Sequence, residues 1–482
     1  MTGLRQVLVP SLPLARFRDL ISDERYETLD AAATRARSRL DGHTLWNVNS
    51  TASGGGVAEM LAVLVGYTRG AGLDVRWLVT HGDDEFFAIT KRIHNRIHGA
   101  RGDDGDLGPA EAAHYARISA ENAALLREQL RPGDVALLHD PQTAGLCGAM
   151  REHDVHVVWR CHIGADIVNE WTEQAWSFVI PHVLEAEAFV FSLAHYVPDA
   201  LRSGHVHIIP PSIDPFSPKN RALDPADVGR IVRRVGLYAG DVEGPAARFV
   251  RGDGSDGVVE RRASIVGEGP LDPRLPLVVQ VSRWDHLKDM QGVMMGFANG
   301  VVGRVDANLA LVGPSVAGVT DDPEGAIVLD ECVDAWHRLP PDAQARIRLV
   351  SLPMDDIEEN ALMVNAVQRT STIAVQKSLA EGFGLTVAEA MWKAKPVVAS
   401  PVGGIVDQIA PGTGVLLDDP CDLDGFGDTV AGLLEQPSEI ERFAGNAVIH
   451  VVDHFVGDRH LLRYASLLDE LLGVNRAEDR SE

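Results

Sequence analysis

Residues 372–392 read TIAVQKSLAEGFGLTVAEAMW: a short β-branched run, a glycine turn and an apolar helical pattern. This order is typical of a strand in a parallel α/β sheet that leads into the next helix. In such sheets, ligands bind where strands end and helices begin. Backbone N–H groups near the glycine turn would be open there, at the positive end of the helix dipole, which favours a phosphate. The stretch therefore predicts both a fold class and a binding site.

The same alternation continues along the chain and predicts two series of strands. The proline-rich stretch PPSIDPFSPKN (210–220) separates them, since its prolines disfavour a continuing helix or a central strand. The first series comprises 44–50, 74–80, 134–140, 155–163, 188–194 and 206–212, and the second comprises 275–283, 307–313, 346–353, 372–378, 396–404 and 414–419.

We therefore expect an α/β fold with two doubly wound, Rossmann-like domains that face each other across a cleft. The domains would span 1–213 and 214–455, and a C-terminal helix at 456–482 could pack back on the first. The first 40 or so residues remain unassigned. Residues 238–270 are rich in glycine and charge, so we expect them to be largely a surface insertion.

Composition excludes several classes of protein. The 69 acidic residues outnumber the 44 basic ones, and the net charge of −25 disfavours nucleic acids and anionic membranes as partners. No apolar run reaches membrane-spanning length and the N-terminus does not resemble a signal peptide, so we expect a cytoplasmic protein. The four cysteines are Cys147, Cys161, Cys332 and Cys421. They have no CxxC spacing, so they predict neither a zinc site nor a disulfide framework.

Two glutamates, Glu381 and Glu389, flank the glycine turn with seven residues between them. Carboxylates would repel a phosphate directly, but they can accept hydrogen bonds from hydroxyl groups on either side of a diphosphate. The pattern therefore indicates a sugar nucleotide as ligand. For the pair taken alone, the alternative is one helix residue and one solvated loop charge.

Two further elements favour a sugar nucleotide. Arg283 ends a predicted strand and Lys288 follows in the loop, where two cations can bind a diphosphate and stabilise charge on a leaving group. The stretch VNSTASGGGVAEML (48–61) lacks a GxGxxG pattern and a ribose-binding acid after the next strand, which disfavours a nicotinamide cofactor. Its three glycines, Gly54, Gly55 and Gly56, would allow a ligand to approach the backbone closely. The alternative for this loop alone is a tight turn without a ligand.

Together these motifs resemble those of the retaining glycosyltransferases with two Rossmann-like domains, the GT-B type. Longer strings are similar to the glycosyl-transferring trehalose synthases and the retaining trehalose phosphorylases: WNVNSTASGGGVAEML, DEFFAITKRIHNRIHG, VVWRCHIGAD, PPSIDPFSPKN, DDPEG, VNAVQR and EGFGLTVAEAMWKAKPVV. The resemblance runs from about Leu45 to about Asp419, apart from 238–270. Those families usually carry an acid directly after the HI of the RCHI string, where this chain has Gly164.

The resemblance implies roles for individual residues. Arg283 and Lys288 would hold the donor diphosphate, Glu381 the donor glucose and Glu389 the ribose, while His162 would hydrogen-bond the transferred sugar. Backbone groups would complete the donor site at Gly382, Phe383, Gly384 and Leu385.

The acceptor glucose would bind at a second group of residues. Lys91, His94 and Asn95 share one helix face in DEFFAITKRIHN (84–95), and Asp166 follows the RCHI string. A solvated polar face is the alternative for the three helix residues.

The family's reaction is a front-face transfer that retains configuration. The cations and the helix start would stabilise the departing diphosphate, which takes the proton of the incoming hydroxyl. The assigned roles leave no carboxylate for a double displacement, and no metal or other cofactor is expected. The predicted enzyme forms α,α-trehalose reversibly from nucleoside-diphosphate glucose and glucose.

Three alternatives to this function remain open. One is a trehalose phosphorylase that uses phosphate and α-glucose 1-phosphate, another is a sugar-nucleotide epimerase, and the third is a sugar-binding protein without turnover. The sequence also leaves open the nucleotide base of the donor and a homodimer.

Overall fold

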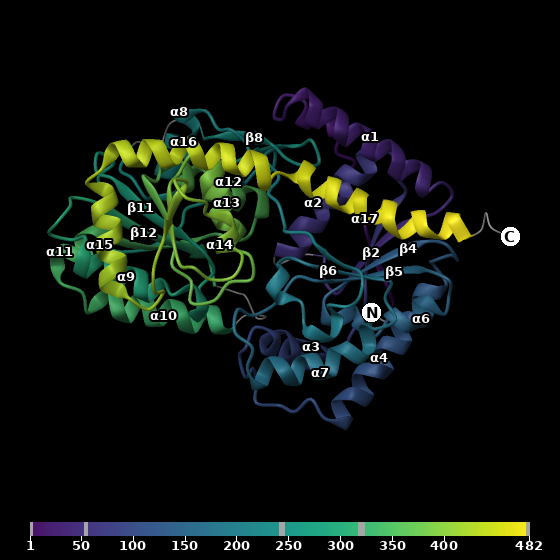
Figure 1. Cartoon of the computed structure of the whole chain (residues 1–482). Helices are drawn as coiled ribbons and strands as arrows, with labels where there is room; N and C mark the ends of the chain where they lie inside the picture. Colours follow the sequence, from purple (N-terminus) through teal and green to yellow (C-terminus); the bar gives the residue numbers. More distant parts are fainter. Residues whose placement is uncertain (1–2, 53–55, 241–245, 317–322, 479–482) are drawn as a thin grey trace. The chain divides into compact units, whose positions relative to one another are not determined.

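The computed structural model describes residues 3–52, 56–240, 246–316 and 323–478, the last five of them by their backbone alone. The chain divides into two compact units, Met1–Ser212 with Phe455–Glu482, and Ile213–His454. Each unit is built on a seven-stranded sheet with helices packed on it (Figure 1). The predicted α/β class with two Rossmann-like sheets is thus confirmed. Among the described helices, none is both long and apolar enough to cross a membrane.

The sheet of the first unit is parallel except at one edge. There, β1 pairs antiparallel with β3, and its three residues were not predicted as a strand. The strand β7 ends before the two prolines at 210–211, so it is shorter than predicted. The strand order is β1 (Arg5–Val7), β3 (Val75–Val79), β2 (Leu45–Asn49), β4 (Val135–His139), β5 (His156–Cys161), β6 (Ala188–Phe191) and β7 (Val206–Ile208).

The C-terminal helix α17 (Gly457–Glu478) belongs to this first unit. It runs beside α1 (Asp23–Arg39), a helix within the N-terminal residues that the sequence left unassigned (Figure 1, yellow and purple). The guanidinium of Arg25 donates two hydrogen bonds to the buried carboxylate of Asp458, with Nη2 at 2.6 Å from Oδ1. This charge-assisted pair fixes the register of α1 against α17.

The sheet of the second unit separates two hydrophobic cores. Val278 and Leu309 point to one side and pack with α9 (Met290–Gly300) and α15 (Leu423–Leu434). Their strand neighbours point to the other side and pack with α8 (Pro225–Val235) and α12 (Ile357–Thr370). The strand order is β10 (Ser264–Val266), β13 (Ile347–Leu352), β12 (Asn308–Pro314), β11 (Leu277–Val281), β14 (Ile373–Gln376), β15 (Val397–Ala399) and β16 (Gly414–Leu416).

In each sheet, the chain first adds strands on one side of a central strand and then crosses over to add strands on its other side. In the second unit it adds β12 and β13 on one side of β11 and then crosses to add β14, β15 and β16 on the other. In the first unit the same change falls between β2 and β4. Ligand sites form outside the carboxyl ends of the strands at such a switch point.

Most described residues of the segment 238–270 are exposed or half-buried, but the segment also contains strands and buried side chains that we did not predict. Within it, β8 (Arg248–Val250) and β9 (Asp256–Val258) form an antiparallel hairpin, and β10 pairs with β13 at the edge of the sheet. The side chains of Phe249 and Val259 are buried in the core beside α8 and α12. Short strands rich in charge and glycine carry too little periodicity to be recognised, so the sequence pattern missed them.

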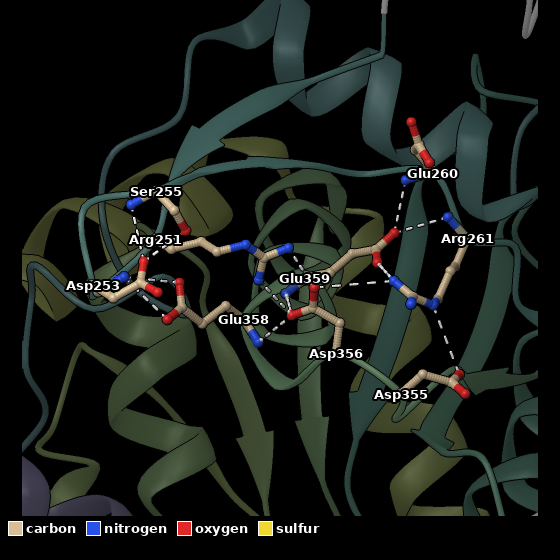
Figure 2. A network of polar contacts seen from close by, with 10 residues as sticks. Arg251, Asp253, Ser255, Glu260, Arg261, Asp355, Asp356, Glu358 and Glu359 are labelled. Atoms are coloured by element: carbon tan, nitrogen blue, oxygen red, sulfur yellow. Dashed lines mark hydrogen bonds and ion pairs between the residues drawn. The ribbon is translucent and has the colours of Figure 1, made fainter.

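A network of charged groups holds the hairpin to the start of α12 (Figure 2). Arg251 binds Asp356 through both terminal nitrogens, at 3.0 and 2.6 Å. The carboxylate of Glu359, 1% exposed, accepts hydrogen bonds from the backbone N–H groups of Glu260 (2.7 Å) and Arg261 (2.8 Å) and pairs with the Arg261 side chain. The hairpin thereby fixes the loop that follows β13.

Candidate active site

The loops after β11 and β14 meet at the switch point of the second unit. Nζ of Lys288 donates a hydrogen bond to Oε2 of Glu381 at 2.7 Å, and Oγ of Ser378 lies 3.3 Å from the same oxygen. The Lys288 and Glu381 side chains are only 15% and 13% exposed. Two motifs that lie far apart in the sequence therefore share one shielded ion pair.

Arg283 lies on the more exposed side of the loop after β11. Its side chain is 61% exposed and pairs with Asp285, with Nη2 2.8 Å from Oδ2. Asp285 also accepts a hydrogen bond from the N–H of Leu287 at 2.8 Å, at the start of the short helix His286–Lys288. This loop positions the two predicted cations differently, one toward Glu381 and one toward solvent.

Buried polar groups that we did not predict anchor this loop to β14. The side chain of Gln280 donates to the carbonyl of Lys288 at 2.7 Å and accepts from the N–H of Lys377 at 3.0 Å. The fully buried ammonium of Lys377 pairs with Asp289, which caps α9 through the N–H of Gly292. A lysine at the end of an apolar strand requires such a partner, and that was the available signal in the sequence.

The glycine turn has the conformation that the sequence implied. Gly384 has φ of 78°, and a Cβ there would lie 3.0 Å from both Glu381 and Ile405, so larger residues would be strained. The helix α13 (Leu385–Trp392) follows it. The N–H groups of Gly384, Leu385 and Thr386 have no hydrogen-bond acceptor among the described residues. They can bind an anion at the helix start.

The other predicted backbone positions in this turn are already engaged. The carbonyl of Gly382 accepts from the N–H of Gly404 at 3.2 Å, and that of Phe383 accepts from Gln408 at 2.5 Å. The Phe383 side chain is buried. These two residues shape the turn from within.

Glu389 lies on α13 and is only 7% exposed. Its Oε1 lies 3.7 Å from Nζ of Lys219, and its Oε2 is buried without a hydrogen-bond partner among the described residues. An unpaired buried carboxylate oxygen costs free energy. A hydroxyl donor from a ligand would remove that cost.

In the first unit, His162 follows β5 within a polar cluster. Its Nε2 lies 3.0 Å from Nδ1 of His139, and Nε of Arg160 donates to its ring at 3.1 Å. The backbone N–H of His162 donates to Oδ1 of Asp140 at 2.8 Å. Burial, together with the charge of Arg160, lowers the pKa of His162 well below its ordinary value, so the ring is neutral at pH 7.

The acceptor candidates of the first unit lie on two elements. Lys91 is exposed on α3 (Asp84–Ile97), where His94 and Asn95 follow it on the same face and are half-buried. Asp166 lies on the loop that follows β5, and its carboxylate pairs with the ring of His195 at 3.0 Å. Gly56 begins α2 (Gly56–Gly70), whereas Gly54 and Gly55 lie outside the described residues.

Asp140, which we did not predict as a site residue, should make stability depend on pH. Burial raises its pKa to about 7 from 3.8. The contribution of the neutral Asp140 carboxyl to the free energy of unfolding is therefore fully present below about pH 4, and it is lost as the pH rises through 7. Relative to an Asp140→Asn variant, which keeps an acceptor for His162, the free energy of unfolding should fall by on the order of 3 kcal/mol between pH 5 and pH 8. Urea unfolding of both proteins at each pH measures this, and a constant difference would contradict it.

The chain is similar to known proteins over nearly its whole length. Residues 47–198 match the family described as "Trehalose synthase, N-terminal domain", and residues 359–448 match "Glycosyl transferases group 1". The trehalose synthase of Rubrobacter xylanophilus is 34% identical over 96% of this chain and 97% of its own. That of Thermococcus litoralis is 32% identical over 95% and 96%.

More distant relatives share the fold. A trehalose phosphorylase of Pleurotus pulmonarius is 28% identical over 84% of this chain and 54% of its own. The crystal structure of an α,α-trehalose 6-phosphate synthase from Burkholderia multivorans superposes with a TM-score of 0.63 at 15% identity, over 91% of this chain and 98% of the other. The chain spans nearly the full length of the trehalose synthases and only about half of the phosphorylase. This protein therefore belongs to the trehalose synthase family of glycosyltransferases.

Proposed function

We propose that the enzyme transfers glucose from a nucleoside-diphosphate glucose to free glucose, with retention, and so forms α,α-trehalose reversibly. The observation that carries this proposal is the contact between Lys288 and Glu381, 2.7 Å apart at the switch point of the second unit. A cation suited to a diphosphate therefore lies beside a carboxylate suited to sugar hydroxyls, which supports the proposal. The relatives named trehalose synthase supply the identity of the product.

The donor diphosphate would bind between the loop after β11 and the start of α13. Lys288 and Arg283 bring positive charge, and the open N–H groups at Gly384 and Leu385 add hydrogen bonds at the helix start. As the glycosidic bond to the diphosphate breaks, these groups stabilise the charge that develops on the leaving oxygen. Glu381 accepts hydrogen bonds from the donor glucose.

The acceptor side of the reaction is assigned to the first unit. The incoming hydroxyl passes its proton to the departing phosphate oxygen, on the same face of the sugar. His162, with its neutral ring, would exchange one of its contacts with His139 or Arg160 for a hydrogen bond to the transferred glucose. The helix residues Lys91, His94 and Asn95, with Asp166, bind the acceptor glucose.

Activity should survive metal chelation. Within the described part of the chain, no three His, Cys, Asp or Glu side chains are grouped to hold a metal ion, and two cations with a helix start supply positive charge at the phosphates. Excess EDTA should leave most of the turnover intact. If activity disappeared with chelator and returned with Mg²⁺ or Mn²⁺, this electrostatic account would be wrong.

Product analysis tests the proposed reaction. The protein is incubated with glucose and each of ADP-, UDP- and GDP-glucose, and separately with glucose and α-glucose 1-phosphate. Trehalose from a sugar nucleotide supports the proposal and identifies the base. Trehalose only from glucose 1-phosphate would show a phosphorylase, and no transfer with any donor would remove the catalytic assignment.

A further inference from the structure

We infer that Lys219 binds the donor ribose together with Glu389, the two side chains sharing one ribose hydroxyl. This inference rests on the proposed function and adds a binding residue to it. Lys219 lies in the stretch that links the two strand series, outside both motifs of the donor site.

The distance between the two side chains carries the inference. Nζ of Lys219 lies 3.7 Å from Oε1 of Glu389, which is longer than a normal hydrogen bond. An oxygen atom can lie about 2.8 Å from both atoms at once, since 3.7 Å is less than the sum of two such bonds. A hydroxyl can donate to the carboxylate and accept from the ammonium. A phosphate would suit the lysine alone, because the carboxylate would repel it.

The enclosure of the Glu389 carboxylate also favours a ligand donor, although its unpartnered oxygen, Oε2, is not the one that faces Lys219. The carboxylate is 7% exposed, and its second oxygen, Oε2, is buried without a hydrogen-bond partner among the described residues. Lys393, the next buried cation, donates to the backbone carbonyl of Glu389 at 3.0 Å and to Asn220 at 2.8 Å. Burial lowers the pKa of Lys393, and the charge of Glu389 partly offsets this. Among the described residues, Lys219 is the one whose ammonium forms an ion pair with this carboxylate.

The backbone around Lys219 is fixed in place. The amide of Asn365 donates to the carbonyls of Pro218 and Arg221, both at 2.9 Å. The indole of Trp392, at the end of α13, donates to the carbonyl of Asn220 at 2.9 Å. A lysine held on such a segment loses little conformational freedom when a ligand binds.

Calorimetry with deoxy nucleotides tests the shared hydroxyl. The probe is whichever of ADP, UDP and GDP the unchanged protein binds most tightly, with its 2′-deoxy and 3′-deoxy forms. Lys219→Met should weaken the ribonucleotide about 10- to 100-fold. It should leave the deoxy form that lacks the shared hydroxyl nearly unchanged, and Lys219→Arg should restore most of the affinity.

Two further variants complete the design. Glu389→Gln should lose the same discrimination between the ribonucleotide and that deoxy form. Arg230→Met is the control. Arg230 is a cation of the same unit that pairs with Asp227 on α8, so its replacement should not change the affinity for any of the nucleotides. Thermal unfolding of each variant checks that it folds.

The outcomes separate this inference from the proposed function. An equal loss for all three nucleotides in Lys219→Met would show that the lysine acts on the phosphates, and unchanged affinities would show no role; either overturns the inference alone. If the unchanged protein bound none of the three diphosphates, the proposed function would fail as well.

Discussion

Replacing Lys288 with alanine is expected to lower turnover by at least about a hundredfold, because one preorganised charge-stabilising group commonly contributes roughly 3 kcal/mol to the transition state. Its ammonium contacts Glu381 at 2.7 Å, so the substitution also leaves a shielded carboxylate without its cation. Arg283→Ala should have a loss of similar size. Initial rates of trehalose formation at saturating donor and acceptor measure both.

His286 provides a matched control on the same loop. Its ring pairs with Glu324 and Glu331 at 3.3 and 3.0 Å, away from the proposed phosphate site. His286→Ala should therefore change turnover little. Near-normal activity in a folded Lys288→Ala protein would contradict the role of Lys288 in stabilising the departing diphosphate.

The two glutamates should separate in their effects on binding. Glu389→Gln should weaken the binding of both the free nucleoside diphosphate and the sugar nucleotide by about tenfold or more. A buried carboxylate that accepts a hydrogen bond from a hydroxyl makes binding depend strongly on that contact. Glu381→Gln should spare the nucleoside diphosphate and impair mainly the binding and turnover of the donor sugar. Calorimetric titration with the diphosphate, paired with donor kinetics, measures both halves.

Two outcomes would overturn these roles. If diphosphate binding were lost in Glu381→Gln and unchanged in Glu389→Gln, the assignments would be reversed. If both variants kept full activity and affinity, the glutamates would serve only the fold of the turn and α13.

Parallel strands were the most predictable part of the fold. Each buried, β-branched run expected from the pattern forms a strand, because burial on both faces demands a continuous apolar segment. Four short strands were not predictable in this way, although the edge strands β7 and β16 were predicted. β1, β8, β9 and β10 have three residues each and carry polar side chains, so their pairing depends on partners far along the chain.

The donor site was predictable as far as residue types and spacing reach. The turn at Gly384, the helix after it and the loop from Arg283 to Lys288 follow from local sequence. The buried groups that position this loop were not predicted, because Gln280 looks like an ordinary strand residue and the position of Lys377 at a strand end does not identify its partner.

The sequence by itself determined the α/β class, the two strand series and the family, since these depend on periodicity and on short local motifs. Only the tertiary structure decided which charges meet. It joined Lys288 to Glu381, enclosed Glu389 beside Lys219 and set His162 among His139, Arg160 and Asp140. The physical reason is that electrostatic partners and burial arise from contacts between distant segments, which no local pattern encodes.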